Sequence, residues 1–226
     1  MDKASCGLFY YNYYWRIMTR PAAKRAFSVA VVILGAGRSA RMGKPKLLLP
    51  WGGTTVLGHL VQQWQALGAN QIAVVCAADD LGIQAELDRL GLPEANRIYN
   101  PAPECGMFSS IQCAAQWPGW QAAVTHWAIV LGDQPHLKQE TLRRVLEFSA
   151  AQPEKLCQPA RHGHGRHPVL LPKALFRQLP DSTAATLKEF LAALGRPVAL
   201  CELDDPGLEL DIDRPEDYEA ARKLIS

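Results

Sequence analysis

The feature that most constrains the fold is an apolar run, Val29–Ile33, that leads directly into a segment rich in glycine and cations, residues 34–46. A short apolar run bounded by glycines is typical of a buried strand. In the segment that follows, glycines allow backbone N–H groups to turn toward an anion, and Arg41 and Lys46 supply positive charge. The sequence therefore predicts a strand that delivers a phosphate-binding loop.

Two familiar phosphate-binding loops do not fit this segment. The P-loop pattern G-x-x-x-x-G-K-[ST] needs a hydroxyl group after its lysine, whereas Lys44 is followed by Pro45. The dinucleotide fingerprint needs an acid about 20 residues after its glycines. No Asp or Glu occurs between Asp2 and Asp79, so this second pattern fails as well.

What remains is a loop with its own cations at the spacing G-x-G-x-S-x-R-M-G-x-x-K. This spacing resembles the signature of nucleotidyltransferases of the sugar-nucleotide and molybdenum-cofactor type, which usually begins L-A-A-G, so Gly35 replaces one small residue with another. Four further motifs resemble that family in its own order: a glycine-then-serine helix start, a metal-binding strand end, a G-H-P-V element and a closing D-x-D-T-P-E-D segment. They fall at residues 105–111, 131–135, 166–170 and 211–218. The resemblance runs from Val29 to roughly the C-terminus, and within the family it is to the molybdenum cofactor cytidylyltransferase type.

The resemblance implies roles for individual residues of the first loop and of the glycine-serine helix start. Arg41, Lys46 and Asp133 would be catalytic. Arg41 and Lys46 can also be read as solvated loop cations, although two cations beside three glycines suit phosphate geometry. The implied nucleotide-binding residues are Leu34, Gly35, Ala36, Gly37, Arg38, Ser39, Arg41, Met42, Gly43, Lys46, Gly106, Ser109 and Ser110.

Asp133 is the main candidate for a metal ligand because it follows the strand expected at residues 126–131. Mg²⁺ binds through one or two carboxylates together with substrate phosphates, which suits Asp133 with a second carboxylate from the closing segment. That second ligand is Asp211 or Asp213, with Asp213 preferred. Taken alone, Asp133 also fits a turn or helix-capping role. With the glycine loop beside it, we expect Mg²⁺ as the cofactor.

The G-H-P-V element implies that Arg166 and His167 contact the acceptor, with Arg166 standing where the family usually has glycine. A structural role for His167 is an equal alternative. His162 and His164 lie near His167 in a glycine-broken stretch without a neighbouring cysteine, which disfavours a zinc site. Residues 181–190 depart from the glycine- and acid-containing stretch that the resemblance leads us to expect, so the acceptor stays open.

Apolar periodicity alternates strands with helices along the chain. Such alternation implies the α/β class, here a three-layer α/β/α sandwich with a mostly parallel sheet, in which ligands bind beyond the carboxyl ends of the strands. The resemblance adds that the fold is a Rossmann-like nucleotidyltransferase fold. Strands are expected at residues 29–34, 71–76, 97–99, 126–131, near 155–158 and at 198–202, with an extended piece at 168–171. Helices are expected at 54–67, 81–90, 109–116, 139–150, 173–178, 183–194 and from 214 or 215 to 224.

Length and composition favour one folded unit. A chain of 226 residues that is 48% hydrophobic can bury one large core, which we place in a single domain at residues 28–226. Residues 1–27 are expected to form an N-terminal extension, either disordered or non-native, with Met18 as an alternative start. Residues 1–28 carry a net charge of +4, whereas the whole chain carries +2, so the remaining residues are slightly acidic. The expected folded part therefore offers no basic surface for nucleic acid.

The compartment and the reaction follow from these observations. No apolar stretch reaches the length of about 18 residues that a membrane span needs, and the six cysteines show no C-x-x-C pairing, which is typical of reduced thiols in a cytoplasmic protein. The expected function is Mg²⁺-dependent transfer of a nucleotide from a nucleoside triphosphate to a phosphorylated small molecule. CTP, a molybdopterin acceptor and a molybdoenzyme or its chaperone as protein partner rest on the resemblance alone. The alternatives are another acceptor, such as a sugar phosphate, or a nucleotide-binding accessory module without turnover.

Overall fold

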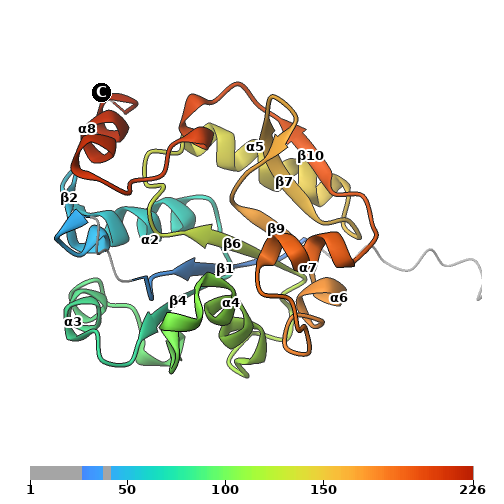
Figure 1. Ribbon diagram of the computed structural model, residues 1–226, viewed down its shortest axis with the longest axis horizontal. Helices are drawn as coiled ribbons and strands as arrows, with labels where there is room; N and C mark the ends of the chain where they lie inside the picture. The colour runs from blue at the N-terminus through green and yellow to red at the C-terminus, as the bar shows by residue number, and fades with distance from the viewer. Residues whose placement is uncertain (1–26, 38–41, 226) are drawn as a thin grey trace, which may run out of the picture.

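The computed structural model describes residues 27–37 and 42–225. Its centre is an eight-stranded sheet with the order β10-β7-β9-β6-β1-β4-β5, in which β8 pairs with β7 at one side (Figure 1). Strands β4, β1 and β6 run parallel, as do β4 with β5 and β10 with β7. The strands are β1 (Val29–Leu34), β4 (Gln71–Ala77), β5 (Arg97–Asn100), β6 (His126–Leu131), β7 (Cys157–Arg161), β8 (His164–Gly165), β9 (Val169–Pro172) and β10 (Ala199–Glu202).

Seven α-helices within the described residues flank this sheet on both faces (Figure 1). The expected three-layer α/β/α class with a mostly parallel sheet is confirmed. The α-helices are α2 (Val56–Ala66), α3 (Leu81–Arg89), α4 (Met107–Gln116), α5 (Gln139–Ala151), α6 (Lys173–Phe176), α7 (Leu187–Ala193) and α8 (Pro215–Lys223). Short 3-10 helices occur at η2 (Lys46–Leu48), η3 (Glu94–Asn96), η4 (Pro103–Cys105) and η5 (Pro206–Glu209).

The core consists of two apolar clusters, one on each face of the sheet. Alternate residues of β1 point into them: Val31 and Ile33 belong to the cluster that contains α2, α3 and α5, while Val32 belongs to the cluster that contains α4, α6 and α7. A strand that is buried on both faces reads as a continuous apolar run, which explains why β1 was recognisable in the sequence.

Three features of the strand arrangement differ from the expectation. Strand β9 runs antiparallel to both β6 and β7, and the direction of a strand leaves no trace in its apolar pattern. A small hairpin of β2 (Pro50–Trp51) and β3 (Thr54–Thr55) was not expected. Strand β7 begins two residues later than expected because Lys155 still belongs to the turn after α5, where its N–H donates to the Gln152 carbonyl at 2.9 Å.

Several helices are shorter than expected. Helix α7 begins at Leu187 rather than near residue 183, because the Thr186 hydroxyl accepts the Glu189 N–H and caps the helix there. Helix α6 ends at Phe176 rather than at residue 178. Helix α2 begins at Val56 rather than at residue 54, because the Thr55 hydroxyl accepts the Gly58 N–H at 3.0 Å and caps the helix.

The strand register places the candidate site. Leu34 at the end of β1 pairs with Leu131 at the end of β6 and with Val75 near the end of β4. The loops that follow these strands therefore leave the sheet at the same edge. The Gly35 N–H donates to the Val75 carbonyl at 2.8 Å, which fixes the first residue of the glycine loop against β4.

The expectation for residues 1–27 falls almost entirely outside the described residues. Phe27 is the exception: its ring lies 4.6 Å from the ring of His126, and its side chain packs against the core. No helix in the described ranges has the length and apolar character needed to cross a bilayer.

Candidate active site

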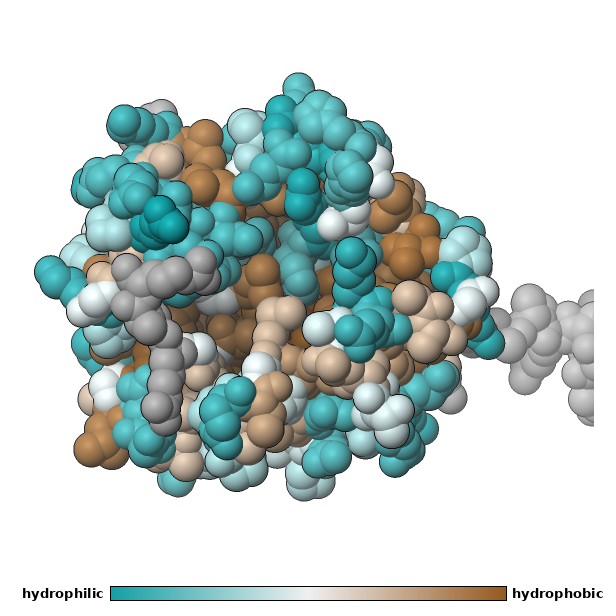
Figure 2. Space-filling model, viewed as in Figure 1, coloured by the Kyte–Doolittle hydropathy of each residue, from teal (hydrophilic) through white to brown (hydrophobic). Residues whose placement is uncertain are grey.

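A pocket of about 260 Å³ opens at the edge of the sheet where β1 and β6 end. Figure 2 shows the hollow in the middle of the viewed face, with an apolar floor and a largely hydrophilic border. Eight residues singled out from the sequence line the pocket, together with Leu47, Pro103, Met107, Leu131 and Gly132, which were not. The eight are Leu34, Gly35, Ala36, Gly37, Lys46, Gly106, Ser110 and Asp133.

Two glycines allow the loops after β1 and β6 to approach each other closely. A Cβ atom on Gly132 would lie 2.7 Å from the Leu34 carbonyl oxygen and 2.8 Å from Leu47 Cδ2. A Cβ atom on Gly35 would lie 3.0 Å from Leu47 Cδ1. The buried Leu47 side chain thus packs over both turns, and it anchors the backbone of its neighbour Lys46 at the rim of the pocket.

Lys46 joins two of the predicted carboxylates. Its ammonium group lies 2.9 Å from Asp133 Oδ2 and 3.2 Å from Asp213 Oδ1. Asp213 reaches this position because the Ile212 N–H donates to the Asp133 carbonyl at 3.1 Å, which ties the late segment to the end of β6. Asp211 lies beside the pair and accepts a hydrogen bond from Gln134 Nε2 at 2.9 Å.

The pKa values in this cluster reflect burial and charge together. Partial burial lowers the pKa of Lys46, but the charge of Asp133 and the hydrogen bonds to Asp133 and Asp213 outweigh it, so the net shift is upward. The pKa of Asp211 is raised, first by desolvation and then by the negative charge of Asp133. Among the described residues, three carboxylates therefore lie near one lysine, an arrangement that suits a further cation.

The donor set fits a hard divalent cation that is shared with a substrate. Asp133 Oδ1 is buried and has no hydrogen-bond partner within the described part of the chain. In the same ranges, no three His, Cys, Asp or Glu side chains form a ready-made metal site. Mg²⁺ usually takes one or two carboxylates plus phosphate oxygens rather than a complete protein cage. Asp133 and Asp213 are the residues that would hold it here.

The opposite wall of the pocket is shaped by Asn100, which the sequence reasoning missed. Its side-chain amide donates to the hydroxyls of Ser109 and Ser110 at 2.8 and 2.9 Å, and its Oδ1 accepts the Ala102 N–H. Ser109 in turn donates to the Gly106 carbonyl at 2.8 Å. Asn100 ends β5 at the same sheet edge as the other loops, so its position at a strand end was the signal that could have found it.

The predicted acceptor residues lie on the other side of the carboxylates. His167 Nδ1 lies 3.3 Å from the Ile129 carbonyl. Burial lowers the pKa of His167, and this carbonyl and the charges of Asp211 and Asp133 offset the shift only in part. The neutral imidazole is therefore the favoured form near neutral pH.

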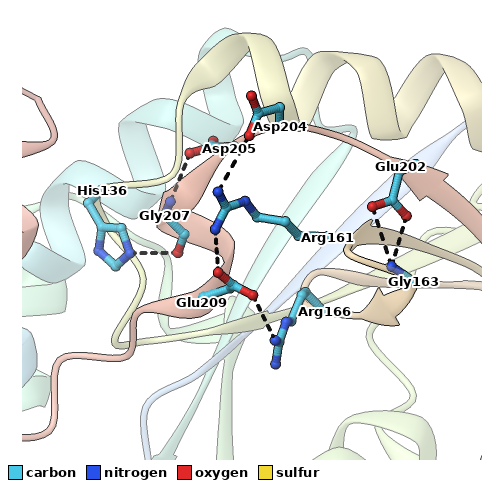
Figure 3. A network of polar contacts seen from close by, with 9 residues as sticks. All are labelled: His136, Arg161, Gly163, Arg166, Glu202, Asp204, Asp205, Gly207 and Glu209. Atoms are coloured by element: carbon cyan, nitrogen blue, oxygen red, sulfur yellow. Dashed lines mark hydrogen bonds and ion pairs between the residues drawn. The ribbon is translucent and has the colours of Figure 1, made fainter.

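Arg166 and Arg161 both contact Glu209 (Figure 3). Arg166 lies 3.4 Å from Glu209, and Arg161 additionally lies 3.5 Å from Asp204. The Nε atoms of both arginines are buried without a hydrogen-bond partner among the described residues. The two arginines thus form a cationic pair, and the Glu209 carboxylate contacts both of them.

Several predicted residues do not line the pocket in the described structure. Met42 packs against the core, Gly43 adopts a positive φ of 64° in the loop, and the Ser109 hydroxyl is engaged in the turn described above. Arg38, Ser39 and Arg41 lie outside the described residues. Their predicted roles stay predictions.

The glycine loop and Lys46 follow one parallel strand, β1, and Asp133 follows its neighbour β6, so that backbone N–H groups, a cation and a carboxylate meet in one pocket suited to the phosphates of a nucleotide. The chain belongs to the family described as the MobA-like NTP transferase domain, whose model matches residues 31–198. The protein is a nucleotidyltransferase.

Comparisons with individual proteins agree with this family. The chain is 25% identical over 198 residues to the molybdenum cofactor cytidylyltransferase of Escherichia coli K12, covering 87% of this chain and 96% of the relative. The structure resembles that of Rv0371c from Mycobacterium tuberculosis H37Rv with a TM-score of 0.69 at 26% identity, covering 89% and 100% of the two chains. The mycobacterial protein has also been solved in complex with manganese. A nucleotidyl transferase from Methanothermobacter shares the fold with a TM-score of 0.71 at 21% identity, covering 88% and 98% of the two chains.

Proposed function

We propose that this nucleotidyltransferase moves CMP from CTP to the phosphate of a molybdopterin-type acceptor and releases pyrophosphate. The observation that carries the proposal is the meeting of the glycine-lined pocket with Lys46, Asp133 and Asp213 at one edge of the sheet. CTP and the molybdopterin acceptor are supported by the match to the Escherichia coli cytidylyltransferase over most of both chains.

The chemistry needs alignment and charge compensation rather than a protein nucleophile. An acceptor phosphate oxygen attacks the α-phosphorus of CTP, a new P–O bond forms, and the bond to the β-phosphate oxygen breaks with departure of pyrophosphate. The backbone of residues 35–37 faces the pocket and is suited to the phosphates. Lys46 stands at the same wall and is suited to the charge that develops on pyrophosphate.

Mg²⁺ is the proposed cofactor, held by Asp133 and Asp213. A bound divalent cation supplies Lewis acidity at the phosphate oxygens and offsets their charge. The buried Asp133 Oδ1 without a partner among the described residues and the raised pKa of Asp211 support a cation at this place. The manganese complex of the mycobacterial protein makes Mn²⁺ a suitable experimental probe.

The acceptor is proposed to approach from the side of His167 and the two arginines. A neutral His167 can donate or accept a hydrogen bond without adding charge. Arg161 and Arg166 are the cations that face this side in the described structure, and a guanidinium group suits a phosphate or carboxylate through paired hydrogen bonds. An anionic acceptor would compete with Glu209 for them.

The reaction is tested by measuring pyrophosphate release with CTP, GTP, ATP and UTP, each with and without molybdopterin cofactor or a sugar phosphate. We expect release with CTP and the molybdopterin acceptor in the presence of Mg²⁺. Release only with a sugar phosphate would identify a sugar phosphate, rather than molybdopterin, as the acceptor. Nucleotide binding without any pyrophosphate release would favour an accessory module without turnover.

Asp133→Asn tests the proposed metal ligand. Removal of this charge while the side-chain shape is kept should lower turnover by about 100-fold or more, as is typical when a preorganised electrostatic group is lost. Asp79→Asn, at an exposed position after β4, is the matched control and should retain full turnover. Mg²⁺-dependent turnover that survives in Asp133→Asn would refute the assignment.

A further inference from the structure

Lys46 occupies the place between two carboxylates that come from distant parts of the chain. Asp133 follows β6, Asp213 precedes α8, and the Lys46 ammonium group lies 2.9 and 3.2 Å from their oxygens. All three side chains are largely shielded, with 19% of Lys46, 22% of Asp133 and 33% of Asp213 exposed. The Lys46 ammonium group therefore bridges the two groups proposed as metal ligands.

We propose that Lys46 is an internal substitute for the divalent cation: it bridges Asp133 and Asp213 in the ligand-free protein and gives up this place when a metal–nucleotide complex enters. An ammonium group between two carboxylates satisfies the same negative charge that a divalent cation would satisfy. A metal ion on Asp213 and the unpartnered Asp133 Oδ1 would lie within a few ångströms of an ammonium group on Asp133 Oδ2 and Asp213 Oδ1, and two cations that close repel each other strongly.

The backbone of Lys46 suits such an exchange. The residue begins η2, whose next residue, Leu47, is buried and packs over Gly35 and Gly132. The backbone is thus anchored, while the four-carbon side chain retains rotatable bonds. Lys46 also lines the pocket beside the glycine loop, so the ammonium group needs to travel only from the carboxylates toward the phosphates.

The exchange predicts that metal and nucleotide bind together rather than independently. Without a nucleotide, a metal ion must displace Lys46 from two carboxylates, and the displaced ammonium group gains no phosphate in exchange. With a nucleotide, the triphosphate offers the released ammonium group a new anionic partner. This last step rests on the proposed function, whereas the competition between Lys46 and the metal does not.

The test measures Mn²⁺ binding without nucleotide, by electron paramagnetic resonance of free Mn²⁺, for the full-length wild type and two variants. Lys46→Met keeps the length of the side chain and removes the competing charge, so it should bind Mn²⁺ about tenfold more tightly or better than the wild type. Lys44→Met, at an exposed position two residues away, is the matched control and should bind like the wild type. Equal or weaker Mn²⁺ binding by Lys46→Met would overturn the proposal.

A second measurement guards against a variant that folds poorly. Without metal, Lys46→Met removes the cation that bridges Asp133 and Asp213, so its melting temperature should fall, and saturating Mn²⁺ should raise it by more than it raises that of the wild type. The double variant Lys46→Met with Asp213→Asn should lose this extra stabilisation. Equal stabilisation of Lys46→Met and the wild type by Mn²⁺ would contradict the exchange.

The outcomes separate this proposal from the proposed function. Tight nucleotide-free Mn²⁺ binding by Lys46→Met, combined with no pyrophosphate release by the wild type on any acceptor, would uphold the exchange and reject the reaction. Normal CMP transfer by the wild type, combined with unchanged Mn²⁺ affinity in Lys46→Met, would uphold the reaction and reject the exchange.

Discussion

At the scale of single residues, the site depends on how closely two turns can pack. Gly132 lies against the backbone of β1, since a Cβ atom there would meet the Leu34 carbonyl at 2.7 Å. Gly35 is less tightly confined: its Cβ atom would meet the end of the Leu47 side chain at 3.0 Å and the Val75 carbonyl at 3.1 Å. The Leu34 carbonyl cannot move away from a new Cβ atom without shifting β1, whereas the end of the Leu47 side chain can change position.

Alanine substitutions at these two glycines should therefore differ in cost. Gly132→Ala should destabilise the fold by about 1–3 kcal/mol, the usual cost of forcing extra atoms into a packed site, and should lower turnover because Asp133 is the next residue. Gly35→Ala should cost less and retain turnover, consistent with the alanine that the family signature usually has at this position. Urea unfolding of both variants, alongside pyrophosphate release, measures the difference. An equal loss in both would mean that Val75 confines Gly35 as strictly as Leu34 confines Gly132.

At the scale of elements, residues 203–213 connect the proposed acceptor and metal sides of the site. The segment starts beside β7, where the Leu203 N–H donates to the Ala160 carbonyl at 2.9 Å. Further along, its Glu209 contacts both Arg161 and Arg166 (Figure 3). It ends with Asp213 on Lys46. Its middle is fixed by the buried Asp205, which accepts hydrogen bonds from the Thr141 hydroxyl at 2.6 Å and from the Gly207 N–H at 2.9 Å.

Thr141→Val should loosen this segment at its middle. The substitution keeps the shape of the side chain but leaves one oxygen of a buried carboxylate without its donor, which costs about 1–3 kcal/mol or more. Turnover should also fall, since Asp213 belongs to the same segment. Thermal unfolding and pyrophosphate release check both effects, and Thr141→Ser, which retains the hydroxyl, should resemble the wild type. A stable and fully active Thr141→Val would show that the other contacts fix the segment without Asp205.

The elements also show where sequence reasoning succeeds and where it stops. Strands β1 and β6 were recognisable because burial on both faces produces long apolar runs, and their parallel order placed the loops after Leu34 and Leu131 at one edge. The β2–β3 hairpin was missed although Gly52-Gly53, between the β-favouring residues Trp51 and Thr54, is a turn signal. The contact of Arg161 with Glu209 spans 48 positions. Its two ends carry no shared local pattern, so only the fold could reveal it.

At the scale of the whole molecule, burial of histidines links stability to pH. Four histidines have pKa values lowered chiefly by desolvation, and they lie in different parts of the fold: His59, His126, His136 and His167. Because burial penalises the charged imidazolium, the neutral imidazole is favoured at each of these positions. His126 lies 2.9 Å from the Pro153 carbonyl, and His136 lies 3.0 Å from the Gly207 carbonyl.

Stability should therefore fall as the solution is made mildly acidic. A histidine whose pKa is lower in the folded than in the unfolded state binds its proton preferentially when unfolded, so protonation below the unfolded pKa of about 6.5 favours unfolding. The raised pKa of Asp211 acts in the opposite direction, but only nearer the acidic range where carboxylates titrate. Between about pH 7.5 and 5.5 we expect the melting temperature to drop, by about 2–4 °C for each kcal/mol lost. Calorimetry across this range measures the drop, and His126→Gln should reduce its steepness because one of the four groups is removed. A melting temperature that stays constant over the range would show that the folded protein accommodates these imidazolium groups as well as water does.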